Sequence, residues 1–358
     1  MVTLTEADLD KGRVGIELEM ILRRDLFNAR TPIGEEFLHV FSVNGFTKKI
    51  DDTIVIHTVS KDVYYEPLET NNQELQGAMW LDLLPRLTAI LSWLKRRDLV
   101  WVDKNSRQVY ATEEPPKSTM RSNLYQVELP RAKLPGNPSC GVHIHFHAEE
   151  WFDHFDHAMS FAELWNYAMG VFRDESHPAR YHKGDESFTP AGDEYASFSP
   201  LRIPDPEQID TSLRYWTSSA PQGDEKAKNA YIVSNFLKWI SNHRWTALNL
   251  TKVDVRKDVE FRFMHGTLNI ETIIHWFRLL VALIEASKAG DIRDFKQYLQ
   301  TKEPGIYSDH IKRKNALANA DTSRADVWNA PKVPSTRAIR RLLNVPDGES
   351  YGFSSIRP

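Results

Sequence analysis

Three histidines occupy alternate positions within the segment SCGVHIHFHAEEW, residues 139–151: they are His143, His145 and His147. A period of two is typical of a β-strand, so all three imidazoles are expected on one face of that strand. Imidazoles in this arrangement bind a metal ion or a proton, or they lie partly buried with ordinary hydrogen-bond partners. The spacing leaves these alternatives open, and other residues must decide between them.

An acidic pair stands on a second candidate strand, RVGIELEMIL, residues 13–22. Glu17 and Glu19 are expected on the same face as Gly15, with the two glutamate Cα atoms about 6.6–6.8 Å apart. The opposite face is apolar and consists of Val14, Ile16, Leu18 and Met20. Two carboxylates this close destabilise a buried face unless a cation lies between them, whereas on an exposed face they are simply solvated.

A third segment, DVEFRFMHG at residues 258–266, combines acids with an arginine. Strand alternation separates a polar set from an apolar set, with Asp258, Glu260, Arg262 and Met264 on one face and Val259, Phe261 and Phe263 on the other. If the polar face lines a cavity, its acids would bind a divalent cation and Arg262 would hold a phosphate bidentately. On the protein surface, Glu260 and Arg262 would form an ordinary ion pair.

The composition is that of a globular protein with a substantial core. The 358 residues are 41% hydrophobic and 26% charged, which suits one large domain or two ordinary ones. A net charge of −4 and a pI near 6.4 give no electrostatic reason to expect nucleic-acid binding. The single cysteine, Cys140, excludes an intrachain disulfide framework. With no apolar run long enough to span a membrane and no signal-like N-terminus, we expect a cytoplasmic protein.

The elements that must position these segments are strands and helices in irregular order. Further candidate strands cover residues 37–43, 53–59, 63–70, 99–103, 107–111 and 244–251. Candidate helices cover residues 79–97, 151–172, 226–242 and 270–290, the last with Asn269 as its N-cap. Strands with one polar face favour an antiparallel sheet with helices packed on one side, because a parallel sheet buried on both faces shows continuous apolar runs. The predicted fold class is therefore α+β.

Two segments are expected outside regular structure. Residues 174–225 are rich in Pro, Ser, Gly and Asp, which indicates a long ordered loop or lid. After residue 300 the chain becomes polar and basic, which is typical of a solvated tail or a docking surface. His154 and His157 lie on a polar face of a candidate helix and are expected to be solvated.

Four blocks of the chain together resemble the amidoligase family, which is related to glutamate–cysteine ligase and glutamine synthetase. The blocks are GIELE, CGVHIHF, RWTALNL and VEFRFMHGTLNIETIIHW, and they follow the family's order over residues 15–276. The resemblance implies a glutamine-synthetase-like catalytic domain over residues 1–300, with a curved antiparallel sheet that forms a half-funnel backed by helices. Residues 301–358 would be a basic C-terminal extension. The implied reaction joins a carboxylate to an amine through an acyl phosphate made from ATP, and releases ADP and phosphate.

The resemblance also implies roles for single residues. Glu17, Glu19, His143 and Glu260 look like ligands of Mg²⁺ or Mn²⁺ at the ATP phosphates, and Glu260 and Arg262 look catalytic. Contacts to the nucleotide are implied for Arg262, Arg244, Asn249 and His145, with Arg262 at the γ-phosphate and the acyl phosphate.

One further metal-binding acid is implied in KDVYYEPLETNN, residues 61–72, although this stretch lacks the Ser-Pro-Pro-like ending usual in the family. Glu66 is the preferred residue, with Asp62 and Glu69 as alternatives.

Two other functions stay open at this stage. A zinc-dependent hydrolase built on the histidine strand would keep an open coordination position and form no ADP. A non-catalytic nucleotide-binding relative would keep the fold without turnover. For the ligase, the expected partners are a small-molecule or peptide carboxylate and an amine, whose identities the sequence does not specify. Specificity is expected in the 174–225 segment and at the rim of the funnel.

Overall fold

The computed structural model describes residues 4–23, 32–49, 68–96, 99–103, 109–110, 124–128, 141–176, 197–242, 246–267, 269–290 and 292–319. Over these residues the chain forms a six-stranded sheet in the order β2-β3-β1-β7-β9-β8 and a three-stranded sheet in the order β5-β4-β6. Every pair of neighbouring strands is antiparallel. The predicted α+β class with an antiparallel sheet is therefore confirmed.

The strands of the six-stranded sheet are β1 (Val14–Arg23), β2 (Thr47–Lys49), β3 (Leu68–Ala78), β7 (Gly141–His147), β8 (Leu248–Asn249) and β9 (Asp258–His265). The smaller sheet contains β4 (Leu99–Asp103), β5 (Val109–Tyr110) and β6 (Leu124–Glu128). The helices are α1 (Glu6–Leu9), α2 (Pro32–Val43), α3 (Trp80–Arg96), α4 (Ala148–Trp151), α5 (Phe155–Glu175), α6 (Pro206–Ser219), α7 (Glu225–Trp239), α8 (Val253–Arg256), α9 (Ile270–Ser287), α10 (Phe295–Lys302) and α11 (Pro304–Asn319).

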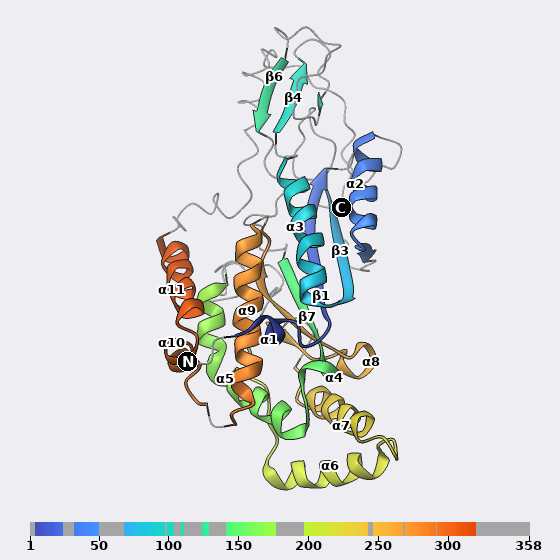
Figure 1. Ribbon diagram of the computed structural model, residues 1–358, viewed down its shortest axis with the longest axis vertical. Coiled ribbons are helices and arrows are strands. Elements are labelled where there is room, and N and C mark those ends of the chain that lie inside the picture. The colour runs from blue at the N-terminus through green and yellow to red at the C-terminus, as the bar shows by residue number, and fades with distance from the viewer. Residues whose placement is uncertain are drawn as a thin grey trace, which may run out of the picture.

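Helices cover one face of the larger sheet, with α3 and α9 side by side across it and α5 beside α9 (Figure 1). The contact is aromatic, because Phe277 of α9 stacks on Trp80 of α3 at 3.7 Å and on Phe146 of β7 at 5.6 Å between ring centroids. Val14 and Ile16 of β1 point into the same core and are 2% exposed or less. Burial of large apolar side chains contributes about 1.5–3 kcal/mol each, so this layer holds the sheet in place.

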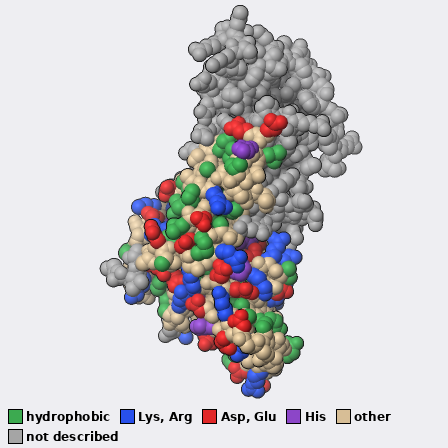
Figure 2. Space-filling model, turned by 45° about the vertical axis from the view of Figure 1, so that its right-hand side comes forward, with side chains coloured by type: hydrophobic (Ala, Val, Ile, Leu, Met, Phe, Trp, Pro, Cys, Tyr) green, Lys and Arg blue, Asp and Glu red, His purple; other side chains and the backbone are tan. Residues whose placement is uncertain are grey.

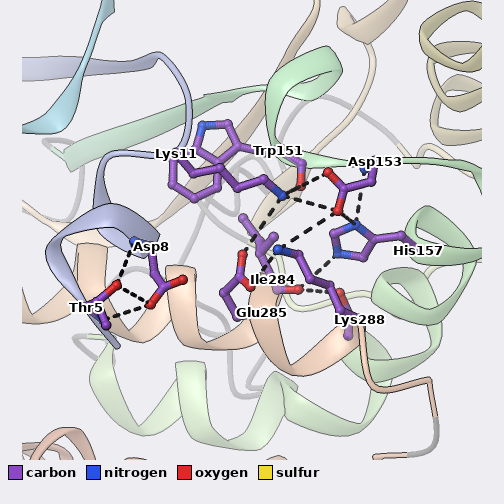
Figure 3. Close-up of polar contacts among 10 residues, drawn as sticks. Thr5, Asp8, Lys11, Trp151, Asp153, His157, Ile284, Glu285 and Lys288 are labelled. Carbon is purple, nitrogen blue, oxygen red and sulfur yellow. Dashed lines mark hydrogen bonds and ion pairs between the residues drawn. The ribbon is translucent and has the colours of Figure 1, made fainter. Parts of the chain in front are cut away.

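A polar network fixes the start of β1 against the helices (Figure 3). Lys11, three residues before β1, donates through Nζ to the carbonyl oxygen of Trp151 at 3.3 Å and pairs with Asp153 at 3.1 Å. Lys288, just past α9, joins the network through Glu285 at 2.6 Å. Because Trp151 ends the helix that follows β7, these contacts tie the entry of β1 to the exit of β7. The two strands therefore enter the sheet with a fixed relation to each other.

Helix α2 shows that the predicted strand at residues 37–43 was wrong. The apolar residues Phe37, Val40 and Phe41 have the i, i+3, i+4 spacing of a helix. The segment interpreted as a strand began at Phe37, so it left out the first turn of the helix, which begins at Pro32. Phe41 is buried against Phe46, with ring centroids 5.8 Å apart. The predicted strand at residues 53–59 lies outside the described residues.

Helix α6 occupies residues 206–219, within the segment interpreted as a loop. Asp205 caps the helix by accepting a hydrogen bond from the backbone N–H of Gln208, and Pro206 stands in the first turn. Proline fits that position because the missing N–H would have no partner there, so the local Pro-Asp composition marked a helix start. A lid role for residues 174–225 stays a prediction.

Helix α11 packs against α5 and α9, so residues 304–319 are not the solvated tail expected after residue 300. Its residues His310 and Arg313 donate to the fully buried carboxylate of Glu175, at 2.8 and 2.9 Å. His275 of α9 donates to the same carboxylate at 3.0 Å. No helix in the described part of the chain is long and apolar enough to cross a membrane.

Candidate active site

The three segments singled out in the sequence are neighbours in the sheet, with β7 between β1 and β9. In the ladder, Glu17 of β1 lies opposite His143 of β7, and His145 lies opposite Glu260 of β9. Directly opposite residues of an antiparallel pair share a face. The ladder register therefore collects the predicted acids and imidazoles on one side of the sheet, away from the face covered by α3 and α9.

His143 lies at the centre of this cluster and is fully buried. Its Nδ1 is 3.5 Å from Oε2 of Glu17 and 3.2 Å from Oε1 of Glu260. Its Nε2 is 3.4 Å from Oε2 of Glu19. Neither ring nitrogen makes a hydrogen bond of good geometry within the described part of the chain. Three carboxylates surround this buried imidazole, and their negative charge favours a bound cation at this position.

His145 and His147 have different surroundings although they follow on the same strand. Nε2 of His145 points toward Oε2 of Glu17 at 3.7 Å, a separation too long for a hydrogen bond. His147 instead contacts Nη2 of Arg13 at 3.2 Å, at the edge of the cluster. Only the first two of the three alternating histidines therefore lie among the central carboxylates.

Glu260 is held from two sides. Arg262 donates through Nη1 to Oε1 at 2.6 Å, and Asn249 of β8 donates through Nδ2 to Oε2 at 2.6 Å. Oδ1 of Asn249 accepts from the backbone N–H and the hydroxyl of Thr251, which fixes the orientation of the amide. The 6% exposed Asn249 thus orients Glu260, and the nucleotide contact implied for it stays a prediction.

The electrostatics of the cluster favour positive charge. Burial lowers the pKa of His143, but the charges of Glu19 and Glu17 outweigh it and raise the pKa to about 9. Burial likewise lowers the pKa of His145, and its contacts with Asp258 and Glu17 raise it to about 10. Burial raises the pKa of Glu260, yet Arg262 and the histidines hold it well below its usual range. Glu260 therefore stays ionised, and the two imidazoles hold their protons when no other cation is present.

A comparison with known families identifies the family of the chain that carries this cluster. The chain matches the family model described as "Putative amidoligase enzyme" over residues 10–284. It is a member of the amidoligase family. No curated protein and no solved structure gave a match. The matched region contains β1, β7 and β9, and membership indicates an enzyme that forms amide bonds.

The residues of the amidoligase cluster fit a divalent cation. Two groups bring their ligand atoms within 4.8 Å of one another: Glu17, Glu19 and His143 in one, and Glu17, His145 and Glu260 in the other. Carboxylates outnumber imidazoles in both groups, which suits Mg²⁺ or Mn²⁺ better than Zn²⁺. Within the described residues, both ring nitrogens of His143 and Nε2 of His145 lack a hydrogen bond, and cations in the two groups would give a partner to one nitrogen of each ring. Glu17 belongs to both groups.

A β-bulge on β9 shapes the amidoligase site. Val142 pairs with Met264 and Ile144 pairs with Phe261, so one residue of β7 faces two residues of β9. The extra residue interrupts the alternation, and both Phe263 and Met264 are fully buried. The prediction that Met264 shares the polar face with Glu260 was therefore wrong. Arg262 lies within the bulge, next to the cluster.

The glycine of the GIELE block has a steric role. Gly15 lies opposite His145, and a Cβ at Gly15 would come within 3.3 Å of the Cβ of His145 and 3.1 Å of the carbonyl oxygen of Leu75. Both contacts are tighter than side chains normally tolerate. A glycine therefore leaves room for the imidazole of His145 at its observed place.

Three further predicted site residues of the amidoligase lie outside the described part of the chain, and one lies on β3. Arg244, Glu66 and Asp62 lie outside the described residues, and Glu69 lies on β3 opposite Leu22. The register of β3 reveals an acid that the sequence interpretation missed.

That acid is Glu74, which stands directly opposite Glu17. Its register position belongs to the face that carries Glu17, because opposite residues share a face. The polar alternation of Thr70, Asn72 and Glu74 was the available signal.

Proposed function

We propose that this amidoligase joins a carboxylate to an amine at the expense of ATP, through an acyl phosphate, with release of ADP and phosphate. The observation that carries the proposal is that Arg262 bonds Glu260 beside two clusters of ligand atoms, each compact enough to hold one cation. Both clusters contain Glu17. Phosphoryl transfer to a carboxylate brings several negative oxygens together, and a site for it needs both cations and a guanidinium.

In this proposal the acidic side chains hold the metal. Glu17, Glu19 and His143 would bind one Mg²⁺ or Mn²⁺, and Glu17, His145 and Glu260 a second. The ions would neutralise the phosphate oxygens of ATP while the phosphoryl group is transferred. Asn249 keeps Glu260 in place for this task, since its amide bonds one carboxylate oxygen at 2.6 Å.

Arg262 would bind the transferring phosphate and then the acyl phosphate. A guanidinium carries five N–H donors in a planar fork, which matches phosphate oxygens. One of them donates to Glu260, and this bond orients the rest of the group. The acyl phosphate must be shielded from water until the amine attacks, so we extend the proposal to a lid role for residues 174–225, which include α6. We further propose that the sheet curves into a glutamine-synthetase-like half-funnel around the nucleotide.

The substrates are proposed by class only: a small-molecule or peptide carboxylate and an amine. The test is ADP formation from ATP with Mg²⁺ or Mn²⁺, screened across pools of amino acids and amines. Adding hydroxylamine in place of the amine would trap an acyl phosphate as a hydroxamate. ADP that forms only when a carboxylate is present, together with hydroxamate, would support the proposal. Zinc-supported hydrolysis without ADP would instead favour the hydrolase alternative.

A further inference from the structure

Asp258, the first residue of β9, contacts the cluster but belongs to neither of the two groups of side chains that could hold a cation. Its Oδ2 lies 2.8 Å from Nδ1 of His145. In the ladder Asp258 lies opposite His147, so this contact runs diagonally across the β7–β9 pair. The carboxylate of Asp258 is 18% exposed and the ring of His145 is 6% exposed, so the bond is largely shielded from water.

The chemistry of this bond determines which nitrogen of His145 carries the proton. An ionised carboxylate can only accept hydrogen bonds, so Nδ1 of His145 must be the donor. In a neutral imidazole, Nε2 then keeps its lone pair. Nε2 is buried, has no hydrogen-bond partner within the described residues, and lies 3.7 Å from the Glu17 carboxylate. In the neutral ring that a metal ion requires, the lone pair of Nε2 therefore points into the group formed by Glu17, His145 and Glu260.

We propose that Asp258 is a positioning residue that fixes the tautomer and ring orientation of His145 for binding a divalent cation through Nε2. The inference rests on the proposed function, because it needs a cation in that group. Carboxylates that accept from the second nitrogen of a metal-binding histidine raise its basicity and restrict ring rotation, and their removal typically lowers metal affinity about 10–100-fold.

Mn²⁺ binding to the metal-free protein provides the test, since it needs no substrate. Free Mn²⁺ is counted by electron paramagnetic resonance, and pulsed measurements report the ¹⁴N coupling of a coordinated imidazole. Asp258→Ala is expected to lower the affinity for the Mn²⁺ ion that shows the ¹⁴N coupling of His145 by about 10–100-fold. Asp258→Asn should have a smaller effect, because its amide oxygen still accepts from Nδ1 without the charge. His145→Gln identifies which ¹⁴N coupling belongs to His145.

Asp254→Ala is the matched control, because Asp254 is a half-exposed acid of α8 whose side chain pairs with Lys238 at 3.2 Å. It should bind Mn²⁺ like the wild type. Thermal unfolding without metal checks that each variant is folded. If Asp258→Ala does not fold, Asp258→Asn alone provides the test.

Wild-type affinity and an unchanged His145 coupling in both Asp258 variants would overturn the positioning role alone. Failure of the wild type to bind Mn²⁺ at all would overturn the proposed cation centre, a result that is distinguishable because it does not depend on Asp258.

Discussion

The guanidinium of Arg262 lies 2.6 Å from the carboxylate of Glu260, and the two side chains are only 13% and 11% exposed. The sequence left open whether these residues form a surface ion pair or line a cavity, and the surface alternative is excluded. Burial lowers the pKa of Arg262, but the charges of Glu260, Glu19 and Glu17 outweigh it and raise the pKa. The guanidinium is thus held in its charged form by the same acids that would hold the cations.

Replacing Arg262 with lysine is expected to lower turnover about 10²–10³-fold, because the ammonium keeps the charge but loses the planar fork. Stability should also fall by about 1–3 kcal/mol, since a buried charged hydrogen bond is disturbed. ADP formation and thermal unfolding measure the two effects. Arg256→Lys, at an exposed position of α8, is the control and should change neither. An Arg262→Lys variant with wild-type turnover would contradict the phosphate-binding role.

Glu17→Gln and Glu19→Gln should differ in how many cations they remove. Glu17 belongs to both candidate groups and Glu19 to one. We therefore expect Glu17→Gln to weaken all Mn²⁺ binding, whereas Glu19→Gln leaves the binding that depends on His145. Mn²⁺ titration monitored by electron paramagnetic resonance gives the stoichiometry. Identical losses in the two variants would mean that the groups do not act as two centres.

Glu74→Gln is expected to reduce Mn²⁺ affinity about tenfold or more, in line with the loss of one acid at a metal site. The expectation follows from the register that places Glu74 opposite Glu17. Glu66→Gln, the acid preferred from the sequence, provides the comparison in the same titration. A loss of affinity in Glu66→Gln but not in Glu74→Gln would restore the original choice.

Glu175→Ala should destabilise the fold by about 3–5 kcal/mol, because it leaves buried cationic partners without their carboxylate. Glu175 accepts from His275, His310 and Arg313, and it is fully buried. Chemical denaturation measures the effect. Glu163→Ala on the exposed side of the same helix is the control, with an expected change of about 0.5 kcal/mol or less. Equal losses in the two variants would show that the cluster does not anchor α11.

The buried side chain of His157 should make the free energy of unfolding fall at acidic pH. The sequence suggested a solvated side chain, but His157 is 2% exposed, donates through Nε2 to the carbonyl oxygen of Ile284 at 3.0 Å and accepts through Nδ1 from the backbone N–H of Asp153. Burial lowers its pKa from 6.5 to about 4. The unfolded chain therefore binds the proton first, and the contribution present above pH 6.5 is lost as the pH falls toward 4.

The loss is expected to reach about 2 kcal/mol after allowance for solvent screening. His157→Gln removes the titrating ring and should flatten the pH dependence of the unfolding free energy between pH 6.5 and 4. An unchanged slope in the variant would assign the acid sensitivity to other groups.

The strands that carry the site were predictable because each has a period of two and two faces of different polarity. Glu17, His143 and Glu260 all lie in such runs. Their meeting was not predictable from alternation, because the order β1-β7-β9 depends on pairing between segments far apart in the chain. The resemblance to the amidoligases supplied that relation.

Features that depend on tertiary packing escaped the sequence interpretation. The bulge that buries Met264 adds one residue to β9 only in relation to β7, so nothing in β9 alone marks it. His157 was expected on a polar helix face, yet α5 turns it toward α9. Similarly, Arg313 belongs to a basic run, and only the fold brings it to Glu175.

The bulge on β9 sets a rule for changes in chain length. Between the Val142–Met264 and Ile144–Phe261 pairs, β9 contains two residues where β7 contains one. A one-residue deletion within the bulge would leave one residue of β9 opposite His143, so the pairs on either side would keep their register and the residues beyond would keep their sides. A one-residue deletion elsewhere in β9, where pairing is one to one, would exchange inward and outward positions for every residue beyond it. Variants of the chain that keep the site should therefore tolerate a change of length in β9 only at the bulge.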